Sequence, residues 1–177
     1  MNFEELNEVT RRFMLSEFEV EQSGGNPYCG STLSEIGLVE FPGLMRRAIA
    51  SGNEQTLINS LLDSAYWKPV DRRGYRIGVT PNAKRLGLSE FNTWYVRGLA
   101  KRLMDEGVIH CQVYRAAMPE GQESPECGIH EGQIYIVQDI YRGHRARYWP
   151  VQGNRSALSI PVGPNCHHTI RRVMYKI

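Results

Sequence analysis

Two short groups of cysteine and histidine are the residues of this chain best suited to chemistry. In Cys127-Gly128-Ile129-His130, a thiol and an imidazole stand three positions apart around a glycine, so a tight turn could bring both to one metal ion. In Cys166-His167-His168, an extended chain would point Cys166 and His168 to one side and His167 to the other. The predicted ligands of a closed, structural zinc site are Cys127, His130, Cys166 and His168.

Other interpretations of the same residues remain open. Two buried cysteines, with histidines satisfied by hydrogen bonds, would need no metal, and Cys127 and Cys166 could instead form a disulfide. A metal-dependent nuclease with a histidine base could be assembled from Glu131, Asn165, His167 and His168. That enzyme needs its base beside a second metal or an open coordination position, and residues 140–177 contain no carboxylate to help build one. Structural zinc is therefore preferred to a nuclease site.

A basic and aromatic segment, residues 141–149, could form a contact surface. In an extended strand, Arg145 and Arg147 would share one face, and Tyr148 and Trp149 could stack on bases or on guanidinium groups. The partner could be a polyanion or the glutamates of another subunit, but a solvated strand over a packed tryptophan explains the segment equally well. The predicted contact residues are Arg142, Arg145, Arg147, Arg171 and Arg172.

Charge is distributed unevenly along the chain, although the formal net charge is only +2. The first 40 residues hold eight glutamates and two arginines, whereas residues 140–177 hold six arginines, one lysine and no acidic residue. Such polarity suits head-to-tail contact between copies of the chain, or contact of the basic end with a polyanion such as DNA. An alternative partner is another protein, recognised through the acidic N-terminal helix.

The hydrophobic pattern predicts an α+β fold, with a helical N-terminal half followed by a small antiparallel β-rich C-terminal half. A helical region with an amphipathic arm would cover residues 1–84, and a helix plus a β-rich domain with a zinc knuckle would cover residues 85–177. Helices are predicted at residues 2–21, 42–50, 54–65 and 89–106, with Asn53 as the N-cap of the third and Gly107 as the left-handed residue after the fourth. Strands are predicted at residues 108–116, 133–140, 145–149, 156–162 and 169–177.

Composition excludes several classes of protein. The chain has 177 residues and 41% hydrophobic content, so it can bury a core, but it has no apolar run of about 18 residues that would predict a membrane span. Its glutamate-rich start argues against a secretion signal, and inside a cell its four cysteines would stay reduced. Glycine-rich phosphate loops and a Gly-x-Ser-x-Gly elbow are absent, so the sequence motifs name no reaction.

Residues 89–177 resemble the C-terminal domain of tailed-phage minor head proteins of the Mu F type. The matching pieces are Arg97 in a helix that ends at Gly107, the strand that follows, Cys127-Gly128-Ile129-His130, Gly132-Gln133-Ile134-Tyr135-Ile136-Val137 and Pro164-Asn165-Cys166-His167-His168. His130 and His168 stand where that family more often has cysteines, and Gly163 replaces a histidine. Residues 138–163 form a longer insertion than the family pattern has, and residues 1–84 have no counterpart in it.

The resemblance implies a non-enzymatic virion component near the portal or neck, present in several copies, with a structural metal knuckle. It would assemble in the host cytoplasm with other copies of itself and other virion proteins, without a membrane. The alternative is a zinc-dependent nucleic-acid-binding protein or nuclease. Both expectations rest on Cys127, His130, Cys166 and His168 lying together in the folded chain.

Overall fold

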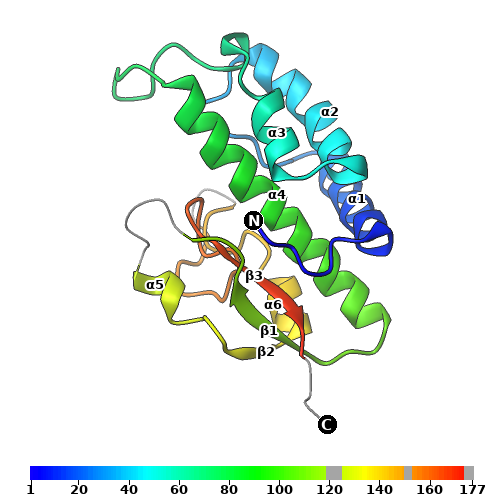
Figure 1. Cartoon of the computed structure of the whole chain (residues 1–177). Helices are drawn as coiled ribbons and strands as arrows, with labels where there is room; N and C mark the ends of the chain where they lie inside the picture. The colour runs from blue at the N-terminus through cyan, green and yellow to red at the C-terminus, as the bar shows by residue number, and fades with distance from the viewer. Residues whose placement is uncertain (119–124, 150–152, 174–177) are drawn as a thin grey trace.

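The computed structural model describes residues 1–118, 125–149 and 153–173, and it has the α+β architecture that the sequence predicts. Figure 1 shows a helical layer on one side of the long helix α4 and a small sheet on the other. The helices of the first half are α1 (Glu8–Ser23), α2 (Glu35–Ser51), α3 (Glu54–Ser60), the short 3-10 helix η1 (Ser64–Tyr66) and α4 (Val79–Asp105). The later elements are β1 (His110–Arg115), α5 (Pro125–Gly128), β2 (Ile134–Ile136), α6 (Val137–Arg142) and β3 (His168–Arg172).

Local capping decides where the first helices begin. The side chain of Asn7 accepts a hydrogen bond from the backbone N–H of Thr10, so α1 begins at Glu8 and not at residue 2 as predicted. Ser34 caps α2 in the same way, and this helix includes Pro42, which the sequence analysis placed at a helix start. The predicted N-cap of α3, Asn53, is confirmed and forms a capping box with Thr56. Each cap satisfies backbone donors that have no partner within the helix.

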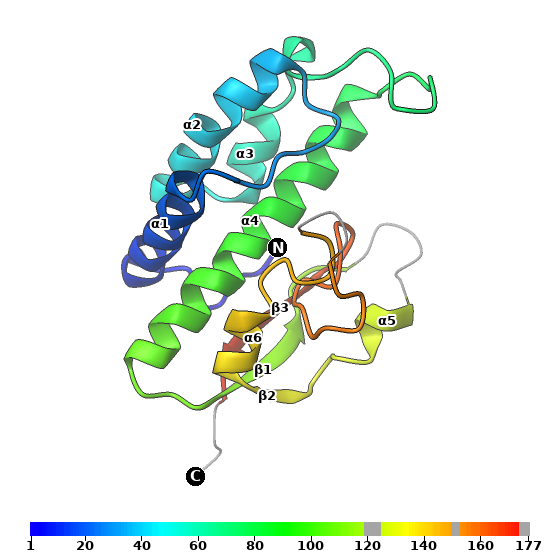
Figure 2. The ribbon, with the colours of Figure 1, turned by 180° about the vertical axis from the view of Figure 1, so that it is seen from behind.

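The helix α4 is the centre of the molecule. Its 27 residues begin at Val79, ten residues before the predicted start at Ser89, whose hydroxyl donates to a carbonyl within the helix. It ends at Asp105. Two residues later, Gly107 has a φ of 72°, as predicted for a helix terminus. On one side α4 packs against α1 and α3, and on the other it packs against α6 and β3 (Figure 2). The expected division between residues 84 and 85 therefore falls inside a helix that both halves share.

Two glycines of α4 allow neighbouring helices to cross it closely. A Cβ atom at Gly98 would lie 2.6 Å from the backbone nitrogen of Met14 in α1. A Cβ atom at Gly87 would lie 2.6 Å from Cγ1 of Ile58 in α3. Because carbon atoms pack at about 3.5–4.0 Å, α1 and α3 could not keep these positions if either glycine carried a side chain. The crossing geometry of the helical layer thus depends on these two residues.

Replacing Gly98 with alanine is expected to lower the free energy of unfolding by about 2 kcal/mol, because α1 must move away from α4. Alanine is otherwise the better helix former by about 1 kcal/mol, so the sign of the change is diagnostic. Gly43 of α2 provides the control, since the nearest atom to its Cβ position is the tip of Arg47 at 3.7 Å. Gly43→Ala should leave urea-induced unfolding unchanged or raise its midpoint. Equal effects of the two substitutions would contradict the close crossing.

The sheet has the strand order β2-β1-β3, with both neighbours antiparallel to β1. The register pairs Cys111 of β1 with Tyr135 of β2 and with Arg172 of β3. Val113 and Ile170, which are fully buried, face each other and pack toward the core that also holds Trp94 and Leu99 of α4. The sheet therefore has one face against α4.

The predicted strands were partly wrong. β1 confirms the strand predicted at residues 108–116, but the one predicted at 133–140 ends at Ile136 and continues as the helix α6. Residues 145–149 form turns, and residues 156–162 contain no strand and include a cis bond before Pro161. β3 covers the start of the last predicted strand, and residues 174–177 lie outside the described part of the chain. Short apolar runs do not distinguish a strand from other buried segments. Within the described residues, no helix combines the length and apolar character needed to cross a bilayer.

Candidate metal centre

Three of the four predicted ligands come together in the folded chain. Cys127 lies in α5, Cys166 precedes β3, and His168 is the first residue of β3. One ligand atom from each lies within 4.8 Å of the other two. The residues are 3%, 6% and 0% exposed, respectively, so the group is closed to solvent. A buried group of two thiols and one imidazole could hold a metal ion.

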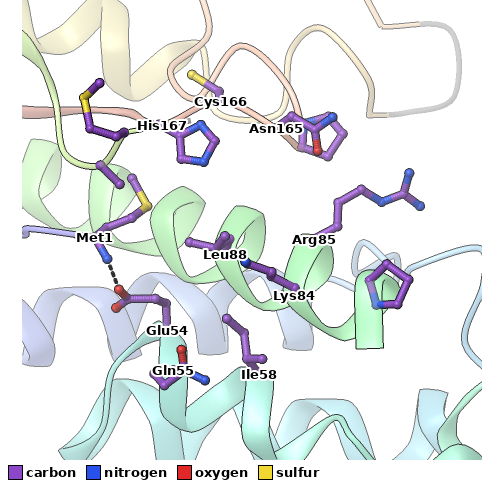
Figure 3. A pocket seen from close by; sticks show the side chains of 14 residues that line it. Met1, Glu54, Gln55, Ile58, Lys84, Arg85, Leu88, Asn165, Cys166 and His167 are labelled. Atoms are coloured by element: carbon purple, nitrogen blue, oxygen red, sulfur yellow. Dashed lines mark hydrogen bonds and ion pairs between the residues drawn. The ribbon is translucent and has the colours of Figure 1, made fainter. Parts of the chain in front are cut away.

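The alternation predicted around Cys166 is confirmed. Cys166 and His168 belong to the same group of candidate ligands, whereas His167 lines a cavity that also includes residues of α3 and α4. In Figure 3 the His167 ring projects from the loop toward α4, and the Cys166 sulfur projects to the other side of the loop. The sulfur of Cys166 and the ring of His167 thus point to different sides of the loop, although Cys166 is also among the residues that line the cavity. His167 is not placed to act as a base on a ligand of this group.

Hydrogen bonds around α5 hold the second half of the group in place. The N–H of His130 donates to the carbonyl of Cys127 at 3.3 Å, which closes a turn after the helix. Gly132, with a φ of 77°, follows in a conformation that favours glycine, and its N–H donates to the carbonyl of Val113 in β1. The turn that carries Cys127 is thus tied to the central strand.

A carboxylate orients the imidazole of His168. Nδ1 of His168 lies 3.9 Å from Sγ of Cys166, while Nε2 lies 3.3 Å from a carboxylate oxygen of Glu131. Glu131 is itself paired with Arg115, 2.7 Å away, and this pairing lowers the pKa of Glu131. A carboxylate at one ring nitrogen is a common arrangement for metal-binding histidines, because it holds the proton there and leaves the other nitrogen as the ligand. Glu131 directly follows His130 in the sequence, but its position beside His168 arises only in the folded chain.

The thiol of Cys166 is acidified by its neighbours. A hydrogen bond from Cys127 is the largest cause, and His168 adds to it, so the pKa of Cys166 falls to about 4 despite burial. The same contact raises the pKa of His168. Thiolate is the form of cysteine that binds metal. Cys127 and Cys166 are not joined by a disulfide in the structure.

The fourth predicted ligand, His130, lies outside the group. Its Nδ1 is 2.7 Å from the hydroxyl of Tyr135 in β2, and its ring is half-buried. Burial lowers the pKa of His130, and the charge of Cys166 partly offsets this effect. The structure therefore supports a site with two cysteines and one histidine, with His130 close by but not among the three converging ligands.

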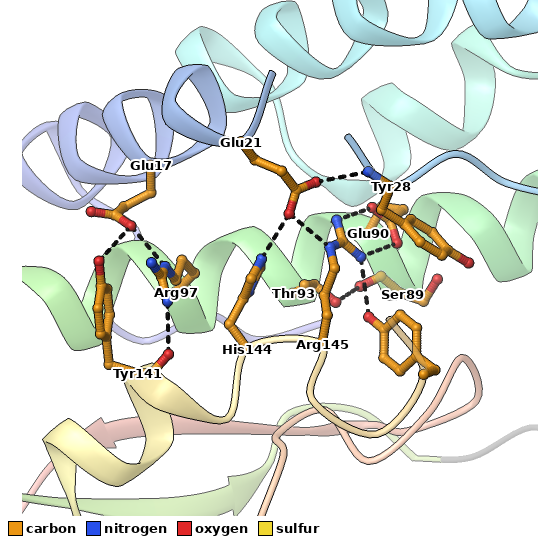
Figure 4. A network of polar contacts seen from close by, with 11 residues as sticks. Glu17, Glu21, Tyr28, Ser89, Glu90, Thr93, Arg97, Tyr141, His144 and Arg145 are labelled. Atoms are coloured by element: carbon orange, nitrogen blue, oxygen red, sulfur yellow. Dashed lines mark hydrogen bonds and ion pairs between the residues drawn. The ribbon is translucent and has the colours of Figure 1, made fainter. Parts of the chain in front are cut away.

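The prediction that Arg145 forms part of a contact surface is wrong, because this residue lies in a buried ion-pair network within the molecule. Its side chain is 2% exposed and makes two hydrogen bonds to Glu90 of α4, at 2.7 and 3.0 Å. A third, at 3.1 Å, reaches Glu21 of α1 (Figure 4). Its guanidinium also lies 4.4 Å from the ring centre of Tyr28. Arg145 adopts a φ of 55°, a conformation that costs free energy in a non-glycine residue, so its contacts must outweigh that cost.

Neighbouring residues extend the network. His144 bonds Glu21 at 3.1 Å, and burial lowers the pKa of His144 to about 4. Although burial opposes the change, the hydrogen bond from His144 and the charge of Arg145 lower the pKa of Glu21 to about 2. Arg97 of α4 joins Glu17 of α1 to the carbonyl of Tyr141 in α6, with both hydrogen bonds at 2.7 Å (Figure 4).

The uneven charge of the chain is therefore largely paired within one molecule. Arg171 bonds Glu4 at 2.9 Å, and Arg172 contacts both Glu5 and Glu106. Arg147 pairs with Glu126 at 2.5 Å, while Arg142 is exposed. An antiparallel sheet that follows a helical half brings the acidic start and the basic end side by side. The polarity of the sequence then explains intramolecular packing without requiring a second copy.

Comparison of the chain with protein-family models, with curated protein sequences and with solved structures gave no match.

Proposed function

We propose that this protein is a non-enzymatic structural component of a tailed-phage-like particle, and that a bound zinc ion stabilises its fold. It would assemble with other copies and other virion proteins in the host cytoplasm. The observation that carries the proposal is the buried group of Cys127, Cys166 and His168. Two of the sequence segments that resemble minor head proteins supply this group. A third such segment lies between them and includes β2, which pairs with β1 in the sheet.

The geometry favours a structural metal over a catalytic one. All three ligands are buried, and the carboxylate that contacts His168, that of Glu131, is also paired with Arg115. His167 faces away from the group, so the nuclease alternative lacks a base beside the metal. A metal at this position would join the α5 turn to the start of β3, two segments that are far apart in sequence. Such a link constrains a small sheet that has few strands of its own.

We infer that assembly also uses an apolar surface, in addition to the arginines predicted as contacts. Apolar side chains are exposed around the edge strand β2: Ile109, Ile129, Ile134 and Ile136 are 65%, 68%, 53% and 47% exposed, respectively. Exposed edge strands with apolar side chains favour pairing with another chain. We infer that β2 is the contact between copies. Arg142, Arg147, Arg171 and Arg172 remain proposed contacts to neighbouring subunits or to DNA.

Light scattering after size-exclusion chromatography tests the assembly proposal. The expected result is a defined multimer, because a ring or connector requires several copies. Ile134→Lys should shift it toward the monomer, since a buried charge at the edge opposes pairing. Ile36→Lys on the exposed side of α2 is the matched control and should leave the multimer intact. A monomer at high concentration would contradict the proposal, and nicking of plasmid that is abolished by His167→Ala would favour the nuclease instead.

A further inference from the structure

A cavity borders the loop that carries Cys166, and Cys166 is one of its lining residues. Its volume is about 520 Å³, within the roughly 300–1,000 Å³ that is usual for small-molecule sites. The α3 helix, the N-terminal half of α4 and the loop before β3 form its walls (Figure 3). Of the three candidate metal ligands, Cys127 and His168 do not line this space.

The walls of the cavity combine basic and apolar side chains. Lys84 and Arg85 of α4, together with Asn165 and His167 of the loop, provide nitrogen donors. Glu54 is the acidic residue among the described residues that line the cavity. Its carboxylate is ion-paired with the N-terminal ammonium of Met1. Ile58, Leu88 and Met118 line the same cavity and offer apolar surface.

This combination selects a particular class of ligand. Arginine recognises the oxygens of phosphate in a bidentate manner, and lysine adds a point charge. The first turns of a long helix also favour an anion, and Pro81 in the first turn of α4 lines the cavity. The apolar wall would cover a ring of the size of a sugar or base.

We propose that the cavity binds a phosphomonoester carried on a ring-sized body, with the phosphate against Arg85 and Lys84. Asn165 and His167 face it from the loop, and Ile58 and Leu88 contact the ring. A free mononucleotide and the phosphorylated end of a nucleic-acid strand share this chemistry. Such a site would give a virion component a contact with nucleotides that does not depend on base sequence.

The metal centre supports the cavity wall, and this part of the inference rests on the proposed function. Cys166 and His168 alternate with His167 and Asn165, so a metal bound to the first pair fixes the second pair against α4. Removing the metal should therefore weaken ligand binding without altering Arg85. This predicts that phosphate affinity depends on metal content.

Calorimetric titration of the purified, metal-containing protein tests the proposal, with AMP, UMP and ribose 5-phosphate as probes. AMP should bind at micromolar to millimolar concentration, and adenosine, which lacks the phosphate, should bind at least about tenfold more weakly. Arg85→Gln should weaken AMP binding by about tenfold and leave zinc content unchanged. The matched control is Arg12→Gln, because Arg12 is exposed on α1 and does not line the cavity.

Several outcomes would overturn the inference. These are no binding by any of the three probes at millimolar concentration, equal affinity for AMP and adenosine, or no effect of Arg85→Gln. A chelated protein that binds AMP as well as the untreated protein would refute only the link to the metal. Zinc content should be measured on the same samples. A protein that contains zinc but does not bind AMP would contradict the ligand proposal, whereas a protein without zinc would contradict the metal proposal. Tighter binding of a 5′-phosphorylated oligonucleotide than of AMP would identify a strand end as the source, and the reverse order would identify a free nucleotide.

Discussion

Cys166→Ser is expected to abolish stoichiometric zinc binding and to lower the melting temperature by about 6–12 °C. Removing one of three buried ligands leaves two that cannot retain the ion, and the link between α5 and β3 is lost. A loss of about 3 kcal/mol corresponds to this shift for a domain of this size. Zinc per chain is measured by elemental analysis, and melting is followed by circular dichroism.

Two other cysteines of the chain provide matched controls. Cys111 is fully buried in β1 but lies outside the candidate site, so Cys111→Ser should destabilise the core without removing zinc. Cys29 is exposed, and Cys29→Ser should change neither quantity. A protein purified without metal and unaffected by added zinc in its melting would end the metal proposal.

Variants of the residues around the site would define its coordination. Glu131→Gln should weaken zinc binding by about 10–100-fold, because the carboxylate that orients His168 is lost. His130→Ala distinguishes the four-ligand site predicted from the sequence from the three-ligand group of the structure. Zinc affinity that is unchanged in His130→Ala would show that the fourth position is not filled by this histidine.

The second large effect is expected in the buried ion-pair network. Arg145→Met should lower the free energy of unfolding by about 3–5 kcal/mol, because Glu90 would remain buried with its charge unpaired. The double variant Arg145→Met with Glu90→Met removes both charges and should recover much of the loss. Urea unfolding of both variants measures the difference.

A surface pair calibrates this result. Arg46 and Glu19 form an ion pair with both side chains nearly half-exposed, so Arg46→Met should cost at most about 1 kcal/mol. A similar loss for Arg145→Met and Arg46→Met would show that the Arg145 network does not stabilise the fold. A double variant no more stable than Arg145→Met alone would mean that the cost arises from the strained backbone or from packing, and not from an unpaired charge.

The sequence by itself determined the α+β class, the N-cap of α3 and the end of α4. These features depend on neighbours along the chain, such as Asn53 with Thr56, or Gly107 after a helix. It also determined which side chains alternate around Cys166, because an extended chain has a period of two. Three of the four predicted metal ligands followed from that alternation and from the turn after Cys127.

Only the tertiary structure decided which acidic and basic side chains pair with each other. The pattern of acidic start and basic end is compatible with contacts between copies and with contacts inside one copy. Folding places Arg145 against Glu21 and Glu90, which are 124 and 55 residues away in the chain, and thereby removes Arg145 from the surface. Likewise, the distance of His130 from the metal group, the role of Glu131 and the cavity beside His167 depend on how β3 packs against β1 and α4. Contacts of such long range leave no periodic signal in the sequence, because they depend on how whole elements pack.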